Sequence, residues 1–300
     1  MMESNALAPV PALVPASHPG GENDSALVEL WLGTKVSAHT RRAYRSEIAR
    51  FRAAMSKPLL LVTMADLVGY AQGLAEGALK PASQNRALTA IKSLLSFGQE
   101  TGYLPFNVGA AVKLRPDADR LAQRILEESE VARLIDRAPA GRDRVMLRLL
   151  YTSGVRVSEL AGLKWCDLMA RGEGGQITVF GKGGKTRAIL LKPKTWGQLS
   201  ALRGEGSGAP GATDPVFRSR KGGHLDVSQI RRIVYRAAAM AGLPRKVSPH
   251  WLRHAHASHA LDRSAPIHLV QATLGHASVS TTGRYLHARP TESSSFYLPD

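Results

Sequence analysis

The stretch "SPHWLRHAHASHA", residues 248–260, contains four of the chain's ten histidines and one arginine. Ser248 is a good helix N-cap, and Pro249 fits the first helical turn, so the stretch is predicted to be a helix. With about 3.6 residues per turn, His250, Arg253 and His254 share one face of that helix. Two kinds of site are to be weighed for this face, a metal site and a phosphate site.

A metal site is disfavoured by the residues between the histidines. His250 and His254 have the i, i+4 spacing of some zinc enzymes, but no glutamate lies between them and Asp262 is the only carboxylate nearby. Arg253 between them would repel a cation. Arginine and histidine together suit a phosphate, because a guanidinium donates two parallel hydrogen bonds to phosphate oxygens.

The charge balance also points to a polyanion. Forty Lys and Arg against 24 Asp and Glu give a formal net charge of +16. Nucleic acid is the favoured partner, and no apolar run approaches the ~18 residues of a membrane span. Cys166 is the single cysteine, which excludes an intrachain disulfide and fits the reducing cytoplasm.

The pattern along the chain predicts two folded domains. Residues 1–24 are expected to be a disordered tail, 25–112 a helical DNA-binding bundle, 113–124 a linker and 125–300 a catalytic domain. A basic excess on the second and fourth helices of the bundle is expected to contact the DNA backbone, through Arg41, Arg42, Arg45, Arg86 and Lys92.

The C-terminal half is predicted to be helical to about residue 170 and then to form a β-hairpin. In "QITVFGKGGKTRAILLK", residues 176–192, apolar residues alternate on both sides of a Lys-Gly-Gly-Lys turn. The expected fold class is therefore mainly α with a small antiparallel β element, an α+β fold.

Three further segments carry residues that suit phosphate chemistry. The segment "TSGVRVSEL", residues 152–160, places Arg156 and Glu159 at i, i+3 on one helix face. The segment "LGHASVSTTGRYLH", residues 274–287, carries His276 and, nine residues later, Tyr285. The hairpin supplies the remaining basic residues of the set, which are Lys182, Lys185 and Arg187.

These residue types fit an in-line attack on a phosphodiester without a metal. Two arginines can clamp the nonbridging oxygens, and a lysine can protonate the leaving oxygen. A tyrosine can attack if a base or strong electrostatic help lowers the barrier, because its ordinary pKa is about 10.

The order Arg-x-x-Glu-Leu, hairpin Lys, His-x-x-Arg, Leu-Gly-His and Tyr resembles the tyrosine recombinase family, which includes phage integrases and Xer-like proteins. The resemblance covers residues 25–287, with the tight motifs in the C-terminal half. It implies a core-binding, SAM-like domain followed by a catalytic domain of the tyrosine recombinase type.

By resemblance, the phosphate is held by Arg156 and Arg253, with His276 as a further ligand. Glu159 resembles the acidic residue that orients the first arginine. On the hairpin, Lys185 and Arg187 are expected to contact DNA. Lys185 is also the alternative to Lys182 as the general acid.

By resemblance, Tyr285 attacks the phosphate to give a 3′-phosphotyrosyl bond and a free 5′ hydroxyl. His250 resembles the proton acceptor for the nucleophile and Lys182 the general acid. Packing is favoured over catalysis for His254 and His259. No ATP, metal or other cofactor is implied, because one diester replaces another.

The implied function is site-specific recombination (integration) of double-stranded DNA by a cytoplasmic, nucleoid-associated enzyme. A homotetramer on two DNA sites is implied, with an accessory DNA-bending protein or partner recombinase as a further option. Type IB topoisomerase-like relaxation and non-catalytic DNA binding remain as alternatives. The target sequence and the biological role, from chromosome dimer resolution to mobile-element integration, stay open.

Overall fold

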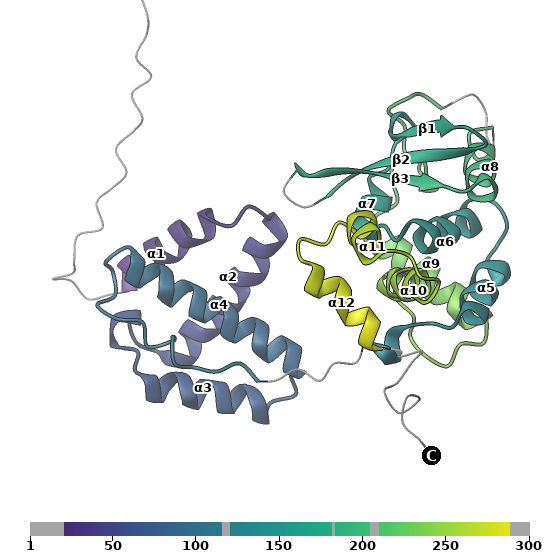
Figure 1. The fold of residues 1–300 in the computed structure, drawn as a ribbon. Helices are drawn as coiled ribbons and strands as arrows, with labels where there is room; N and C mark the ends of the chain where they lie inside the picture. The colour runs from purple at the N-terminus through teal and green to yellow at the C-terminus, as the bar shows by residue number, and fades with distance from the viewer. Residues whose placement is uncertain (1–20, 116–120, 182–183, 205–209, 289–300) are drawn as a thin grey trace, which may run out of the picture. The chain divides into compact units, whose positions relative to one another are not determined.

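The computed structural model describes residues 21–115, 121–181, 184–204 and 210–288. Its contacts divide the chain between Ala118 and Asp119 into two compact units (Figure 1). The two units are described separately below. No helix among the described residues is long and apolar enough to cross a membrane.

The N-terminal unit is a bundle of helices around one apolar core. Trp31 and Phe51 are fully buried in it, and the ring of Trp31 stacks on Tyr44 at 5.3 Å. Thr63 and Asp66 form a capping box at the start of α3. The elements of this unit are α1 (Gly21–Gly33), α2 (Ala38–Met55), η1 (Leu59–Leu61), α3 (Met64–Glu76) and α4 (Pro81–Glu100).

The first helix begins earlier than the sequence pattern predicted. Asp24 is 1 % exposed, and its carboxylate accepts hydrogen bonds from the Leu59 backbone N–H at 2.9 Å and the Tyr103 hydroxyl at 2.7 Å. A disordered tail over 1–24 is therefore wrong for residues 21–24, because Asp24 links three segments of the unit. Residues 1–20 lie outside the described residues.

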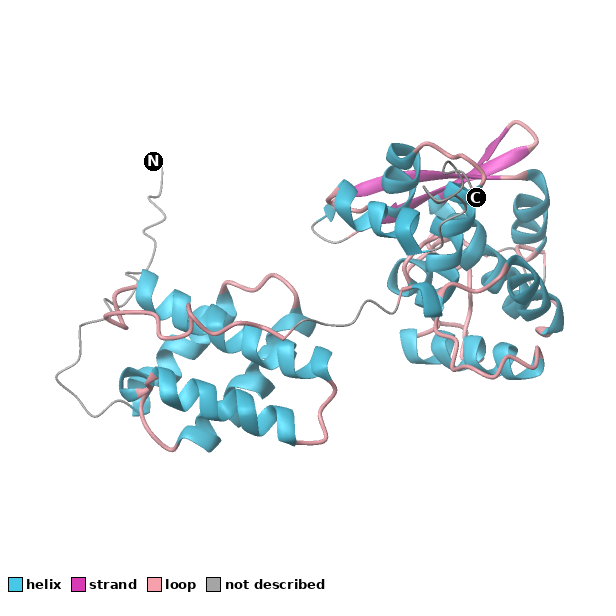
Figure 2. Cartoon of the chain, turned by 60° about the horizontal axis from the view of Figure 1, so that its bottom comes forward, coloured by secondary structure: helices cyan, strands magenta, loops and turns pink. Residues whose placement is uncertain are grey.

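The C-terminal unit combines helices with a small sheet, drawn in magenta in Figure 2. In the described ranges its elements are η2 (Ala122–Arg124), α5 (Glu128–Arg137), α6 (Arg142–Ser153), α7 (Val157–Ala161), η3 (Trp165–Asp167), β1 (Leu168–Arg171), β2 (Gly174–Phe180), β3 (Thr186–Leu191), α8 (Pro193–Ala201), α9 (Val227–Met240), α10 (Pro249–Asp262), α11 (Ile267–Leu274) and α12 (Val279–Ala288). The predicted fold class, mainly α with a small antiparallel β element, is confirmed.

The sheet is antiparallel in the order β1-β2-β3, and Ile177 pairs with Leu168 on one side and Ile189 on the other. The β2–β3 hairpin was predicted. The expectation of helix to about residue 170 is wrong, because β1 starts at Leu168. Gly172, with φ of +55°, makes the turn that folds β1 back onto β2.

The predicted linker 113–124 is also shorter than expected. Leu121 is 7 % exposed and packs with Ile125 and Tyr285 in a small apolar cluster. Residues 121–124 therefore belong to the C-terminal unit, since the buried Leu121 anchors them to its core. Residues 116–120 lie outside the described residues.

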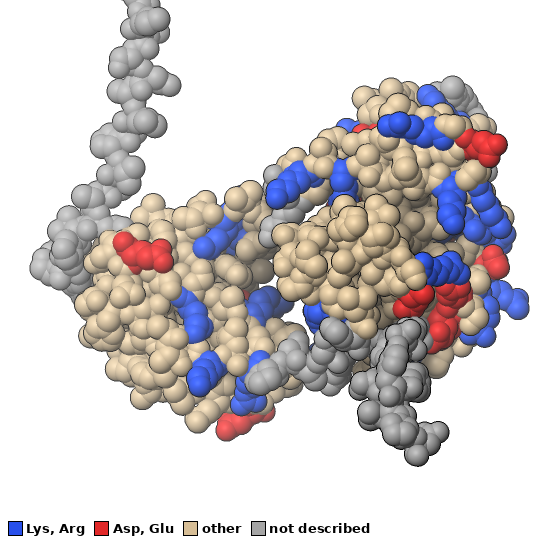
Figure 3. Space-filling view, viewed as in Figure 1, with Lys and Arg blue, Asp and Glu red and all other residues tan. Residues whose placement is uncertain are grey.

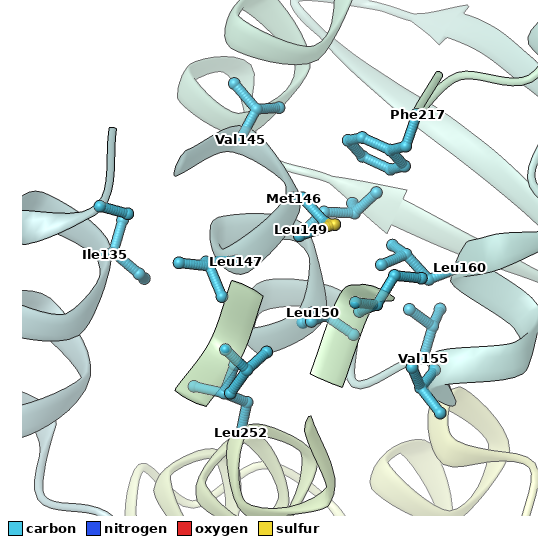
Figure 4. Close-up of a cluster of buried hydrophobic side chains, with 14 of the residues drawn as sticks. Ile135, Val145, Met146, Leu147, Leu149, Leu150, Val155, Leu160, Phe217 and Leu252 are labelled. Carbon is cyan, nitrogen blue, oxygen red and sulfur yellow. The ribbon is translucent and has the colours of Figure 1, made fainter. Parts of the chain in front are cut away.

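Helix α6 runs through the main core of the C-terminal unit. Figure 4 shows its apolar side chains directed toward Ile135 of α5, Leu160 of α7 and Leu252 of α10. Ile135, Leu160 and Leu252 are each at most 4 % exposed. This packing fixes α7 and α10 relative to α6.

Candidate active site

Arg156 precedes α7, and Glu159 lies in its first turn. The Glu159 carboxylate accepts hydrogen bonds from the Arg156 backbone N–H at 2.7 Å and from its Nη1 at 2.9 Å. Nη2 of Arg156 donates to the Gly275 carbonyl at 3.1 Å. The Arg156 side chain keeps 32 % of its surface exposed, so its guanidinium remains open to a ligand.

Arg187 of β3 binds the same carboxylate from the other side. Its Nη1 and Nη2 donate to the two oxygens of Glu159 at 2.9 and 2.8 Å, and its Nε donates to the Thr273 carbonyl at 2.7 Å. The side chain is only 12 % exposed. The expectation that Arg187 contacts DNA therefore differs from the structure, in which its side chain points inward.

Glu159 is thus a buried anion between two arginines. Burial alone would raise the pKa of its carboxyl, but hydrogen bonds and charge from Arg187 and Arg156 bring the pKa below its ordinary value. Glu159 therefore stays ionised at neutral pH. A surface i, i+3 pair is excluded, because the side chain is 3 % exposed.

Arg253 of α10 is 4 % exposed. Its Nη1 donates to the Gly154 carbonyl, and its Nη2 donates to the Leu274 carbonyl at 2.6 Å. Burial and the neighbouring Arg156 lower its pKa to about 10, so it remains charged at neutral pH. Gly154 must be glycine, because its φ is +61° and a Cβ there would lie 2.7 Å from the His256 ring.

Tyr285 of α12 is buried beside two histidines. Its hydroxyl lies 2.8 Å from Nδ1 of His254, and its ring is parallel to that of His276 with centroids 6.4 Å apart. His276 in turn hydrogen-bonds the Thr282 hydroxyl through Nδ1 at 2.8 Å. Tyr285 is 5 % exposed, and this burial raises its pKa, although the charge of Arg253 opposes the shift.

Burial and nearby arginine charges lower the pKa values of two histidines in this region. Burial, followed by the charges of Arg253, Arg156 and Arg187, lowers the pKa of His276 to about 4. Desolvation, followed by the charges of Arg253, Arg231 and Arg156, also lowers the pKa of His250. Burial disfavours any charge, but the arginine charges that contribute to both shifts would favour a bound anion.

His250 is exposed on α10, and its ring centroid lies 6.4 Å from that of His254. The Tyr285 hydroxyl shares a hydrogen bond with His254, for which packing was predicted, and not with His250. The sequence held one signal for this contact, since His250, Arg253 and His254 share a helix face. Spacing on α10 could not show that α12 lies against His254.

The other histidines of α10 have packing contacts. Nδ1 of His256 hydrogen-bonds the Tyr151 carbonyl at 2.8 Å, and Nδ1 of His259 lies 2.9 Å from the Tyr151 hydroxyl. In the part of the chain that is described, no group of three or more His, Cys, Asp or Glu side chains could hold a metal ion.

The predicted general acid Lys182 lies outside the described residues. Lys185, its competitor, is exposed at the end of the hairpin, and its carbonyl accepts a hydrogen bond from the Gly181 N–H at 2.7 Å. The structure thus brings Arg156, Glu159, Arg253, His276 and Tyr285 together with Arg187 and His254. The lysine position stays a prediction.

The predicted DNA-binding residues of the N-terminal unit have several roles. Arg45 pairs with Glu29 at 2.6 Å, and Arg86 pairs with the buried Glu47 at 2.8 Å. Arg41 donates to the Lys35 carbonyl at 2.7 Å, while Lys92 donates to the carbonyls of Ala110 and Val112. Arg42 is exposed. Lys and Arg side chains are spread over the face of each unit that Figure 3 shows.

Lys92 therefore differs from its prediction as a backbone-DNA contact, because its ammonium closes the turn at 110–112. Arg86 differs in part, since its guanidinium neutralises Glu47 while 56 % of the side chain stays exposed. A basic residue on a helix surface is compatible with either role, and the sequence alone does not show its acidic or carbonyl partner.

Comparisons with known proteins agree with this geometry. Residues 124–292 match the model of the phage integrase family, and residues 27–101 match the model of the phage integrase N-terminal SAM-like domain. The chain is 34 % identical over 269 residues to the tyrosine recombinase XerC of Xanthomonas campestris pv. campestris (strain B100), covering 87 % of this chain and 82 % of the relative.

Two solved structures are similar over most of the chain. A crystal structure of XerA recombinase is 28 % identical, covers 93 % of this chain and 98 % of that one, and has a TM-score of 0.52. XerH site-specific recombinase bound to palindromic difH substrate, in a post-cleavage complex, is 21 % identical, covers 94 % and 90 % of the two chains, and has a TM-score of 0.76. This chain therefore belongs to the phage integrase family of tyrosine recombinases.

Proposed function

We propose that this recombinase cuts and rejoins double-stranded DNA at specific sites through a 3′-phosphotyrosyl bond to Tyr285. The observation that supports the proposal most strongly is the position of Tyr285 between His254 and His276, in the positive potential of Arg253. The non-catalytic and topoisomerase-like alternatives are not favoured, because the curated relatives are named tyrosine recombinases.

In the proposed reaction, the guanidinium groups of Arg156 and Arg253 bind the nonbridging oxygens of the scissile phosphate, and His276 adds a hydrogen bond. These donors stabilise the charge that develops during in-line attack. Arg156 has the exposed surface to meet the phosphate, while the carbonyls of Gly154 and Leu274 hold Arg253 in place.

The phenolic oxygen of Tyr285 attacks phosphorus, the bond to the 5′ oxygen breaks, and Lys182 protonates that oxygen. The phenolic proton passes to a histidine, with His254 and His250 as the two candidates. His254 forms the hydrogen bond to the hydroxyl, and burial lowers its pKa to about 4, so it is a neutral acceptor at physiological pH. The phosphotyrosyl diester replaces the DNA diester, so rejoining consumes no ATP and involves no metal.

The partner is duplex DNA, contacted by the N-terminal helical domain and the catalytic domain. Structural relatives include lambda integrase as a dimer on a core site and as a tetramer on a Holliday junction. By analogy we propose a homotetramer on two DNA sites, acting in the cytoplasm in association with the nucleoid. An accessory DNA-bending protein or a second recombinase is a further possible partner.

The test uses nicked duplexes, made from DNA that flanks the coding sequence, in which cleavage releases a short strand and traps the adduct. Wild-type protein in EDTA is expected to give a covalent adduct on a denaturing gel, and Tyr285→Phe is expected to give none. Tyr235→Phe is the matched control, because Tyr235 is a 44 % exposed tyrosine of α9. Absence of any adduct with wild type, while the duplex is still bound, would contradict the proposal.

A further inference from the structure

Arg187 occupies a position that the proposed reaction does not use. We propose that Arg187 is a positioning residue, which fixes the positions of Arg156 and of the loop that carries His276, and does not contact DNA. This inference rests on the proposed function, because the residues that it positions are those assigned to the scissile phosphate.

The first link runs through Glu159. Arg187 donates to both carboxylate oxygens, at 2.9 and 2.8 Å, and Arg156 donates to one of the same oxygens at 2.9 Å. A two-point contact fixes the carboxylate plane, as a single contact would not. The orientation of the Arg156 guanidinium therefore depends on Arg187, although the two arginines share no hydrogen bond.

The second link reaches the loop between α11 and α12. Nε of Arg187 donates to the Thr273 carbonyl at 2.7 Å. Gly275 lies against the same guanidinium: a Cβ at that position would be 3.1 Å from Nη1 of Arg187, and its φ of +64° also favours glycine. His276 is the next residue, so Arg187 sets the backbone that carries this phosphate ligand.

The geometry leaves little room for DNA contact. Nε, Nη1 and Nη2 of Arg187 each donate to a protein oxygen, two of them to the ionised Glu159, whereas the buried Arg253 donates to neutral backbone carbonyls through Nη1 and Nη2. A phosphate on the Arg187 guanidinium would have to displace Glu159, whose side chain is 3 % exposed. Arg156, by contrast, is 32 % exposed. One arginine of the pair is therefore open to a ligand, and the other is committed to the protein.

The experiment compares Arg187→Gln, Arg187→Lys and wild type in two assays. Filter binding at several salt concentrations gives the duplex affinity and its salt slope, and single-turnover adduct formation with saturating protein gives the cleavage rate. Arg171→Gln is the matched control, because Arg171 is an exposed arginine of the same sheet, with one hydrogen bond to Gln176.

We expect Arg187→Gln to keep wild-type affinity and salt slope and to form adduct about 100-fold more slowly, since small misplacements of catalytic groups have effects of that size. Arg187→Lys should recover part of the rate, because an ammonium can bind Glu159 but cannot also hold Thr273. Arg171→Gln should match wild type in cleavage rate.

The opposite split would overturn the proposal: a salt slope lower by about one, with a normal cleavage rate at saturation, is the behaviour of a DNA contact. Thermal melts identify any variant that does not fold. If Arg187→Gln fails to fold, Arg187→Lys decides, and a normal cleavage rate in that variant also overturns the proposal. Lack of adduct with wild type would instead count against the proposed function itself.

Discussion

In the N-terminal unit, Arg45 and Glu29 form a surface pair with side chains 55 % and 62 % exposed, whereas in the C-terminal unit two arginines share a carboxylate that is 3 % exposed. An exposed pair contributes little free energy and can exchange one partner for a phosphate. A buried pair is fixed in place, because separating it would leave an uncompensated charge in the protein interior. The same residue type therefore serves as an adaptable contact in one unit and as a rigid part of a site in the other.

Among substitutions that test this difference between buried and exposed arginines, the largest effect is expected at Arg253. Arg253→Gln should lower the rate of adduct formation by about 1000-fold, because it removes the charged group proposed to donate to the phosphate. Arg45→Gln, in the N-terminal unit, should leave that rate within about twofold at saturating protein. Single-turnover cleavage measures both variants, and equal losses would show that burial does not separate the two classes of arginine.

Glu159→Gln should give the next largest effect. The amide keeps the size of the side chain but removes the anion that holds Arg156 and Arg187, so we expect adduct formation to slow by about 10- to 100-fold. Glu29→Gln is the exposed counterpart and should have no measurable effect on cleavage. A normal rate for Glu159→Gln would mean that shape, not charge, positions the two arginines.

Features that depend on local sequence could be predicted. The β2–β3 hairpin was predicted from alternation within a few residues, and the capping boxes at Thr63 and Asp226 likewise depend on residues only three positions apart. β1 was missed, because four residues are too few to show alternation and its stability comes from pairing with β2.

The site could be predicted only as a set of residue types. Motif order brought Arg156, Arg253 and Tyr285 together, yet hydrogen bonds between distant segments were not visible. Arg187 and Thr273 are 86 residues apart, and His254 and Tyr285 are 31 apart. Such contacts depend on how helices and strands pack. The inward turn of Arg187 therefore had no sequence signal, and the face of α10 shared by His250, Arg253 and His254 did not show which histidine contacts Tyr285.

The stability of the C-terminal unit should depend on pH, because the histidines with strongly lowered pKa values lie in that unit. Burial, in each case the largest cause, lowers the pKa of His254, His256 and His276 to about 4. The unfolded chain binds these protons near pH 6.5, so stability is complete above that pH and is lost as the pH falls toward 4.

The most enclosed of the three, His256, should account for roughly 2 kcal/mol of this loss. Thermal melts at pH 7.5, 6.5, 5.5 and 4.5 measure it, and His256→Asn should flatten the profile, because an amide can still donate to the Tyr151 carbonyl. A melting temperature that does not change between pH 6.5 and 4.5 would contradict the prediction.

A smaller effect is expected at Arg86, because the N-terminal unit also has a buried carboxylate paired with two arginines. Glu47 is 2 % exposed and is held by Arg86 and Arg50. Arg86→Gln leaves one cation on this buried carboxylate and should lower the free energy of unfolding by about 1 to 2 kcal/mol. Urea denaturation measures it, and an unchanged midpoint would mean that Arg50 alone is sufficient.

The smallest effect is expected at Arg42, which lies on α2 like Glu47. Arg42 is exposed, so Arg42→Gln should change the unfolding free energy by less than about 0.5 kcal/mol. If it contacts the DNA backbone, the logarithmic salt slope of binding should fall by about 0.9, with cleavage at saturation unchanged. Arg86→Gln and Arg42→Gln would then differ in kind: one weakens the fold and the other only the DNA complex. A salt slope that moves with Arg86 and not with Arg42 would assign the DNA-facing surface to the other side of α2 and α4.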